Sequence, residues 1–388
     1  MIKNEDLLRL HAKQTGELEI KPTMVVDNRE ELGEAYTPGV AVIAKMIADH
    51  ENLKAKYTIS GKLVAVVTDG SAVLGLGNIG PSAGLPIVEG KALLYKRFSG
   101  VDAIPMAIDQ MNVDEFCQTI KHISKSFAGI HLEDIAAPKC FAIEQKLQEE
   151  LDIPVYHDDQ EGTAIVVLAG LINAAKVVGK SLKDLHVVIN GIGASGVATG
   201  RILFAAGLKH LIFVDKFGVV TANDMRYNAY QRELVKRSDV ETDMLKDAPL
   251  SKVIDQQDVF IGLSVADVLK KTDVQKMADK PIVFALANPV PEILPEAAAK
   301  AGAAVIATGS SKYPNQVNNV LAFPGTFKGL IATGLKKVDG ALEVAIAHGL
   351  AGMIAQPTSE KIIPSVFEPH VADQVYQAVQ NYAKTAKK

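Results

Sequence analysis

One segment of this sequence, residues 185–215, constrains the fold more than any other. A short apolar stretch runs directly into a G-x-G-x-x-G pattern, a helix-forming stretch follows, and a second apolar stretch ends in an acid. In a strand–turn–helix–strand unit, these glycines allow a tight turn and let a pyrophosphate approach the helix N-terminus. We therefore expect a dinucleotide site here, against the alternative of a tight turn without a ligand. The turn residues assigned to this site are Gly191, Gly193, Ala194, Ser195 and Gly196.

The acid at the end of the second apolar stretch is Asp215. A carboxylate at this position accepts hydrogen bonds from the adenine ribose and repels a 2′-phosphate, which favours NAD over NADP. Lys216 follows directly and can offset that repulsion, so NADP stays an alternative.

A second G-x-G-x-x-G match, at Gly75, Gly77 and Gly80, fits a nucleotide site less well. Several residues separate it from the preceding apolar stretch, and Pro81 restricts the conformation of its last glycine. No acid follows where a ribose partner is expected. We interpret residues 75–84 as a close-packed loop that lines a site.

Short apolar stretches alternate with helix-like stretches along most of the chain, which predicts an α/β fold with parallel sheets. We expect an N-terminal α/β domain over residues 1–160 and a Rossmann-like nucleotide-binding domain over residues 161–388, ending in an amphipathic helix. A long Ala/Val/Leu helix, residues 163–178, opens the second domain. The predicted strands are residues 63–67, 103–108, 129–132, 155–157, 185–189, 211–214, 259–263, 282–286 and 304–307.

The composition excludes several classes of protein. The chain of 388 residues carries a formal net charge of −4, no Trp and few aromatic residues, which argues against a general nucleic-acid binder. Two cysteines exclude a disulfide framework and a Cys-rich zinc module. No signal peptide is evident, and the longest apolar run, residues 164–172, is shorter than the ~20 residues of a membrane span. We expect a cytoplasmic protein that binds neither nucleic acid nor membrane.

Two pairs of acids follow predicted strands. Glu133 and Asp134 come after residues 129–132, and Asp158 and Asp159 come after residues 155–157. Because ligands bind beyond the carboxyl ends of parallel strands, the pairs can converge on one hard cation, Mg²⁺ or Mn²⁺. The alternative is that these acids cap the helices that follow.

A series of segments, in one order and spanning nearly the whole chain, resembles the malic enzyme family in its short bacterial form. The resemblance implies that a malic-enzyme-type N-terminal domain precedes the NAD-binding domain. It also implies oxidative decarboxylation of malate to pyruvate and CO₂ with reduction of NAD(P)⁺. The matching segments are residues 36–41, 67–80, 89–91, 132–135, 157–164, 190–196, 287–289 and 318–325.

The resemblance also implies roles for individual residues. Lys91 would take the hydroxyl proton of malate, and Tyr36 would protonate the enol of pyruvate. A lysine accepts a proton only when it is neutral, so the pKa of Lys91 must fall well below its ordinary value of about 10.4. The metal ligands would be Glu133, Asp134 and Asp159, with Asp158 beside them, and the contacts to substrate or cofactor would come from Asn288 and Asn319.

One segment departs from the larger members of the family. They carry an arginine that binds a malate carboxylate where this chain has residues 68–73 without one. Ser71 is the remaining candidate for that contact.

Three other functions stay open at this point. A metal-dependent oxaloacetate decarboxylase would keep the lysine, the tyrosine and the acids without hydride transfer. A malolactic enzyme would convert malate to lactate with NAD retained, and a non-catalytic nucleotide sensor would need none of these residues. The resemblance further implies a homodimer, with the N-terminal helices or the C-terminal helix at the interface.

Overall fold

The computed structural model describes residues 4–73 and 75–386, and it contains two predominantly parallel sheets. The first sheet has the order β2-β1-β3-β4, and every pair in it is parallel. Its strands are apolar and short, as expected of strands covered on both faces. Their bounds are β1 Leu63–Thr68, β2 Asp102–Ala107, β3 Gly129–Glu133 and β4 Val155–His157.

Three long helices pack around the first sheet: α5 Pro81–Ser99, α6 Val113–Ile123 and α7 Lys139–Glu150. The first of these helices begins at Pro81, inside residues 75–84 that we predicted as a loop, so the loop prediction is wrong from residue 81 onward. Gly80 precedes the helix with a φ of 79°, and Pro81 occupies its first position, where a missing N–H costs nothing. The close-packed loop predicted over residues 75–84 therefore ends inside a helix.

The second sheet has the order β10-β9-β8-β5-β6-β7. The strands from β10 to β6 are mutually parallel, whereas β7 pairs antiparallel to β6. No sequence pattern predicts β7, which has only two residues. The bounds are β5 Val187–Asn190, β6 Leu211–Asp215, β7 Gly218–Val219, β8 Val259–Gly262, β9 Ile282–Ala285 and β10 Val305–Thr308.

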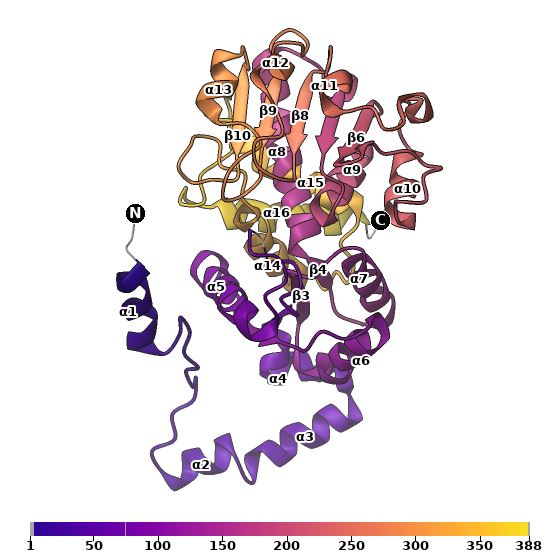
Figure 1. Cartoon of the computed structure of the whole chain (residues 1–388). Coiled ribbons are helices and arrows are strands. Elements are labelled where there is room, and N and C mark those ends of the chain that lie inside the picture. The colour runs from indigo at the N-terminus through magenta and orange to yellow at the C-terminus, as the bar shows by residue number, and fades with distance from the viewer. Residues whose placement is uncertain (1–3, 74, 387–388) are drawn as a thin grey trace.

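Helices cover both faces of this second sheet (Figure 1). One continuous core joins residues of both sheets, including Val66 and Ile189, and a smaller core lies on the other face of the second sheet around Phe260. The helices are α8 Thr163–Val178, α9 Ala194–Ala205, α10 Ala229–Val235, α11 Leu250–Val253, α12 Lys271–Val274, α13 Pro295–Lys300, α14 Phe323–Thr333, α15 Gly340–Gly352 and α16 Val371–Ala386.

Helix α8 runs between the two halves, and a single π-helical turn, Asp158–Gly162, joins it to β4. The combined segment Asp158–Val178 is long and apolar enough to cross a membrane, but 83% of its most apolar window is buried inside the fold. It is therefore a core helix, because protein side chains surround its apolar surface. Helix α14 lies between the halves as well, packed on α5 and on α16.

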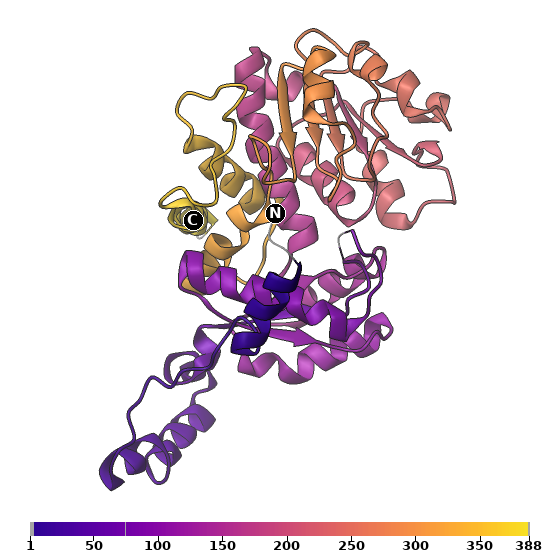
Figure 2. The same cartoon turned by 60° about the vertical axis from the view of Figure 1, so that its left-hand side comes forward.

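The N-terminal region differs from the rest because part of it projects. Helices α2 Arg29–Ala35 and α3 Gly39–Asp49, which we call the arm, extend away from both sheets (Figures 1 and 2). None of the residues of these two helices, all of which the structure describes, is buried. Helix α1 Asn4–Gln14 precedes the arm, and the backbone N–H of Glu17 donates to Glu89 of α5 at 2.7 Å.

Candidate active site

The carboxyl ends of β3 and β4 bring the two predicted acid pairs together. The strands are parallel, and Leu132 pairs with His157, so the residues that follow them lie side by side. Glu133 ends β3, and Asp134 turns the chain with a φ of 56°. Asp158 and Asp159 open the π-helical turn after β4. The alternative that Glu133 and Asp134 cap the next helix is excluded, because α7 begins without a side-chain cap.

Glu133, Asp134 and Asp159 each offer a carboxylate oxygen, and these oxygens lie within 4.8 Å of one another. Oδ2 of Asp134 is buried and has no hydrogen-bond partner among the described residues, while the backbone N–H of Asp134 donates to Asp159 at 2.9 Å. Burial, and then repulsion from Asp159, raises the pKa of Asp134 to about 8. Burial and repulsion from Glu133 raise the pKa of Asp159 to about 6. Three close carboxylates of this kind fit a hard divalent cation.

Lys91 of α5 reaches the same acids. Its Nζ lies 3.2 Å from Oε1 of Glu133, contacts Oδ2 of Asp158, and donates to Oδ1 of Asn319 at 3.3 Å. Burial opposes the charge of the ammonium group, but Asp158 and Glu133 outweigh it and raise the pKa of Lys91. In this arrangement Lys91 is a charged partner of the acids.

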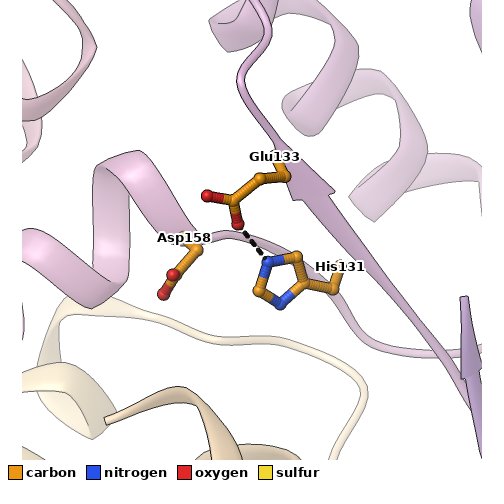
Figure 3. Close-up of side chains that lie close together, drawn as sticks. All are labelled: His131, Glu133 and Asp158. Carbon is orange, nitrogen blue, oxygen red and sulfur yellow. Dashed lines mark hydrogen bonds and ion pairs between the residues drawn. The ribbon is translucent and has the colours of Figure 1, made fainter. Parts of the chain in front are cut away.

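His131, Glu133 and Asp158 form a second close group (Figure 3). Nε2 of His131 lies 2.6 Å from Oε2 of Glu133, and Nδ1 lies 2.8 Å from the hydroxyl of Tyr95. Burial lowers the pKa of His131 to about 3, so the imidazole is neutral. The Lys91 ammonium contacts both carboxylates and so supplies the positive charge that this second group needs.

The polar residues predicted to contact substrate divide into two groups. Asn319, at the start of a 3₁₀ turn, lies against Lys91 and therefore joins the site. Asn288 lies in the loop after β9, where a Cβ at Gly75 would stand 3.5 Å from its carbonyl oxygen. The loop that contains Gly75 therefore packs against the loop after β9, as expected of a loop that lines a site.

Ser71 is held by its neighbours. Its hydroxyl donates to Oδ1 of Asp69 at 2.5 Å and accepts from the backbone N–H of Ala136 at 2.8 Å. Since its single proton is committed to Asp69, Ser71 has none left to donate to a substrate carboxylate. The second oxygen of Asp69 binds Lys139 at 2.8 Å.

Tyr36 lies at the end of α2 in the arm, and 66% of its surface is exposed. Figures 1 and 2 both show the arm far from β3 and α5. Within one chain, the structure therefore does not bring Tyr36 to Lys91.

The dinucleotide turn has the geometry that its glycines predict. Gly191 has a φ of 110°, and a Cβ there would stand 2.4 Å from the carbonyl oxygen of Leu263. A Cβ at Gly196 would stand 2.0 Å from the carbonyl oxygen of Gly191. By contrast, a Cβ at Gly193 meets nothing within 4 Å among the described atoms, so this side of the turn is open. Helix α9 begins at Ala194, directly beside this space, as a pyrophosphate site requires.

Asp215 ends β6, where the ribose partner is expected. One of its oxygens accepts hydrogen bonds from the backbone N–H of Phe217 at 2.8 Å and from the hydroxyl of Tyr227 at 2.9 Å. These two bonds fix the carboxylate at the strand end.

Sequence reasoning missed His131, Tyr95 and Tyr227. His131 and Glu133 are two positions apart on one strand, so their side chains face the same side, and this signal could have paired them. Tyr95 and Tyr227 come from helices or loops distant in sequence from their partners, and no spacing rule indicates either contact.

Family models of two domains match the chain. The malic enzyme N-terminal domain matches residues 15–148, and the malic enzyme NAD binding domain matches residues 160–384.

Full-length relatives are similar over nearly the whole chain. The chain is 46% identical over 388 residues to the bifunctional malic/malolactic enzyme of Bacillus subtilis (strain 168), covering 99% of this chain and 93% of that protein. It is 48% identical over 366 residues to the NAD-dependent malic enzyme of Geobacillus stearothermophilus, covering 94% and 76%.

Solved structures are similar in fold as well. The malic enzyme from Pyrococcus horikoshii superposes with a TM-score of 0.93 at 43% identity, covering 98% of this chain and 91% of that chain. The NAD-dependent malic enzyme from Thermotoga maritima superposes with a TM-score of 0.92 at 42% identity, covering 97% and 99%. These similarities cover both sheets, so they cover the acids at the end of the first sheet as well as the dinucleotide turn of the second.

Proposed function

This chain belongs to the malic enzyme family, and on that premise we propose that it oxidises malate with NAD⁺ and releases pyruvate and CO₂. The observation that carries the proposal is the convergence of Lys91, Asn319 and three carboxylates at the end of the first sheet. The same chain carries a dinucleotide turn that is open beside Gly193, where a Cβ would meet no described atom within 4 Å. A hydroxy acid and a nicotinamide cofactor are the reactants that such a pair of sites suits.

Glu133, Asp134 and Asp159 are the residues that would hold a Mg²⁺ or Mn²⁺ ion. The fit rests on Oδ2 of Asp134, which has no hydrogen-bond partner within residues 4–73 and 75–386, and on three close carboxylates of raised pKa, which together need positive charge. A divalent cation bound there supplies Lewis-acid stabilisation of the negative charge that develops on the substrate during decarboxylation.

Lys91 is the proposed general base. Removal of a hydride from C2 of malate requires loss of the hydroxyl proton, and Lys91 is the buried amine beside the carboxylates. Asp158 and Glu133 hold it protonated in the metal-free chain. When another positive charge binds those carboxylates, they stabilise the Lys91 ammonium less. The pKa of Lys91 then falls toward the range in which the amine can accept a proton. Asn319 orients the amine through the 3.3 Å hydrogen bond.

The cofactor is proposed to be NAD in preference to NADP. Asp215 is held at the end of β6 by Tyr227 and by the backbone of Phe217, so it cannot easily turn away from a 2′-phosphate. Named relatives include both NAD-dependent and NADP-dependent malic enzymes. A direct comparison of the two cofactors in the same assay tests this preference.

Tyr36 is proposed to act in the site of a second copy of the chain. It is exposed on a projecting arm that also exposes Leu32, Val40 and Val42, and such a surface is typical of an interface. In a homodimer built through the arms, each Tyr36 would serve as the general acid for its partner's site.

A mixing experiment tests this arrangement. Lys91→Ala and Tyr36→Phe chains, each inactive alone, are unfolded together and refolded as mixed dimers. If each site combines one residue from either chain, half of the dimers are mixed and carry one intact site of two, so about a quarter of wild-type activity returns. No recovery would contradict the shared site.

We propose a division of the chain near residue 160, because the first sheet ends at His157 and the second begins at Val187. We also propose a cytoplasmic location, to which the two buried free thiols, Cys117 and Cys140, are suited.

A second candidate function is the conversion of malate to lactate. The relative from Bacillus subtilis carries both names, malic and malolactic enzyme, at 46% identity. Product analysis separates the two, since oxidative decarboxylation yields pyruvate with one reduced nicotinamide and the malolactic reaction yields lactate with none. Pyruvate formed from oxaloacetate alone, with no turnover of malate, would instead indicate a decarboxylase.

A further inference from the structure

His131 is a buried side chain that the proposed mechanism does not use, although it contacts a proposed metal ligand. It lies on β3 two positions before Glu133, so both side chains leave the same side of the strand (Figure 3). Nε2 lies 2.6 Å from Oε2 of Glu133, and Nδ1 lies 2.8 Å from the hydroxyl of Tyr95. His131 and Tyr95 are fully buried, and Glu133 is 3% exposed.

The chemistry of the three groups fixes the direction of both hydrogen bonds. A carboxylate only accepts, so the neutral imidazole carries its single proton on Nε2 and donates it to Glu133. Nδ1 is then an acceptor, and the hydroxyl of Tyr95 donates to it. Tyr95 thus satisfies Nδ1 and supports the tautomer that the bond to Glu133 requires.

Aromatic rings hold the orientation of the imidazole. Phe323 of α14 packs edge-on against His131 at 5.5 Å and against Tyr95 at 4.7 Å between ring centroids. Phe327 lies one turn further along α14 and contacts both rings as well. Rotation of the imidazole away from Glu133 would break this packing, so the frame is rigid.

We propose that His131, oriented by Tyr95, is a positioning residue that fixes the carboxylate of Glu133 for the divalent cation. With Oε2 held by His131 and Oε1 3.2 Å from Nζ of Lys91, both oxygens of the Glu133 carboxylate are fixed in place beside Asp134 and Asp159. This inference rests on the metal site of the proposed function. Residues that orient metal ligands in this way change affinity by about 10- to 100-fold when they are removed.

Direct measurement of Mn²⁺ binding, by the electron paramagnetic resonance of free Mn²⁺, tests the proposal without turnover. We expect His131→Leu to weaken Mn²⁺ binding by ~10- to 100-fold. His131→Gln retains an N–H donor and should recover part of the loss. Tyr95→Phe should weaken binding less than His131→Leu, because Glu133 keeps its partner and only the hydrogen bond that anchors Nδ1 of His131 is lost.

Tyr156→Phe is the matched control, since this equally buried hydroxyl also belongs to a ring beside His131 and has no hydrogen-bond partner among the described residues. It should bind Mn²⁺ as the wild type does. NAD⁺ affinity and the unfolding temperature establish that each variant is folded. If His131→Leu does not fold, the Gln and Tyr95→Phe variants decide the matter.

Two outcomes are distinct. If the wild type binds Mn²⁺ and the folded His131 and Tyr95 variants bind it within about 2-fold of the wild type, this inference is wrong and the proposed function stands. If the wild type itself binds no Mn²⁺, the proposed metal site fails, and the role of His131 fails with it.

Discussion

The affinity of the proposed metal site, formed by Glu133, Asp134 and Asp159, for Mn²⁺ should rise steeply with pH. Asp134, with a pKa raised to about 8, and Asp159, with a pKa raised to about 6, hold protons in the metal-free chain at pH values where ordinary aspartates are ionised. A bound cation needs both carboxylates deprotonated, so protons compete with the metal below these pKa values. Raising the pH removes the competitor.

The magnitude follows from the two pKa values. At pH 6 Asp134 is protonated by about 100 to 1 and Asp159 is about half protonated, whereas at pH 8 Asp134 is half protonated and Asp159 is ionised. These ratios of protonated to ionised carboxylate predict that Mn²⁺ binds about 100-fold more tightly at pH 8 than at pH 6. This corresponds to a difference of about 3 kcal/mol in binding free energy. Above pH 8 the dependence should flatten.

Titration with Mn²⁺ at a series of pH values measures this dependence, with spin resonance reporting the free ion. Asp134→Asn removes the proposed ligand whose pKa is raised to about 8, and should bind weakly with only a small pH dependence. Asp114→Asn, at an exposed aspartate of α6, is the control and should behave as the wild type. A wild-type affinity that changes by less than about 3-fold between pH 6 and pH 8 would refute the reasoning.

Three further predictions concern the base, the cofactor and the stability of the fold. Lys91→Ala should lower kcat by at least ~100-fold while calorimetry finds NAD⁺ affinity within about 2-fold of the wild type, and retained turnover would remove Lys91 as the base. Tyr227→Phe removes one of the two hydrogen bonds that hold Asp215, so it should raise the KM for NAD⁺ several-fold at unchanged kcat and reduce the preference for NAD⁺ over NADP⁺. An unchanged ratio of the kcat/KM values for the two cofactors would contradict this role. The pKa of Glu343 is raised to about 8 by burial and by Glu161, so the folded state binds this proton more tightly than the unfolded state and loses stability as pH rises from 4.5 toward 8. Glu343→Gln should therefore raise the Tm at pH 8 and leave it nearly unchanged at pH 4.5, and equal shifts at both pH values would argue against burial of the charge as the cause.

Much of the fold follows from local patterns. Helix α8 begins and ends where the sequence predicts, because a predominantly apolar stretch ends at Gly179, whose left-handed backbone stops the helix. The start of α5 was missed because Gly80, Pro81 and Pro86 read as breakers, although proline is favourable at the first position of a helix. The two-residue β7 is too short for any periodicity.

The candidate site was partly accessible from sequence. The meeting of Glu133 with Asp159 follows from parallel strands that end at one edge, which holds for any chain with this alternation. The place of Lys91 came only from the resemblance, since the packing of α5 on the sheet cannot be read from spacing. In the proposed shared site, the place of Tyr36 depends on a second copy of the chain, which the sequence of a single chain does not specify.

The measurement that tests the central claim most directly is product formation from malate with NAD⁺ and Mn²⁺. The account predicts equal amounts of reduced NAD, pyruvate and CO₂, no reaction when the divalent ion is chelated, and a higher kcat/KM with NAD⁺ than with NADP⁺. Lactate without reduced cofactor, or decarboxylation of oxaloacetate without any oxidation of malate, would contradict it.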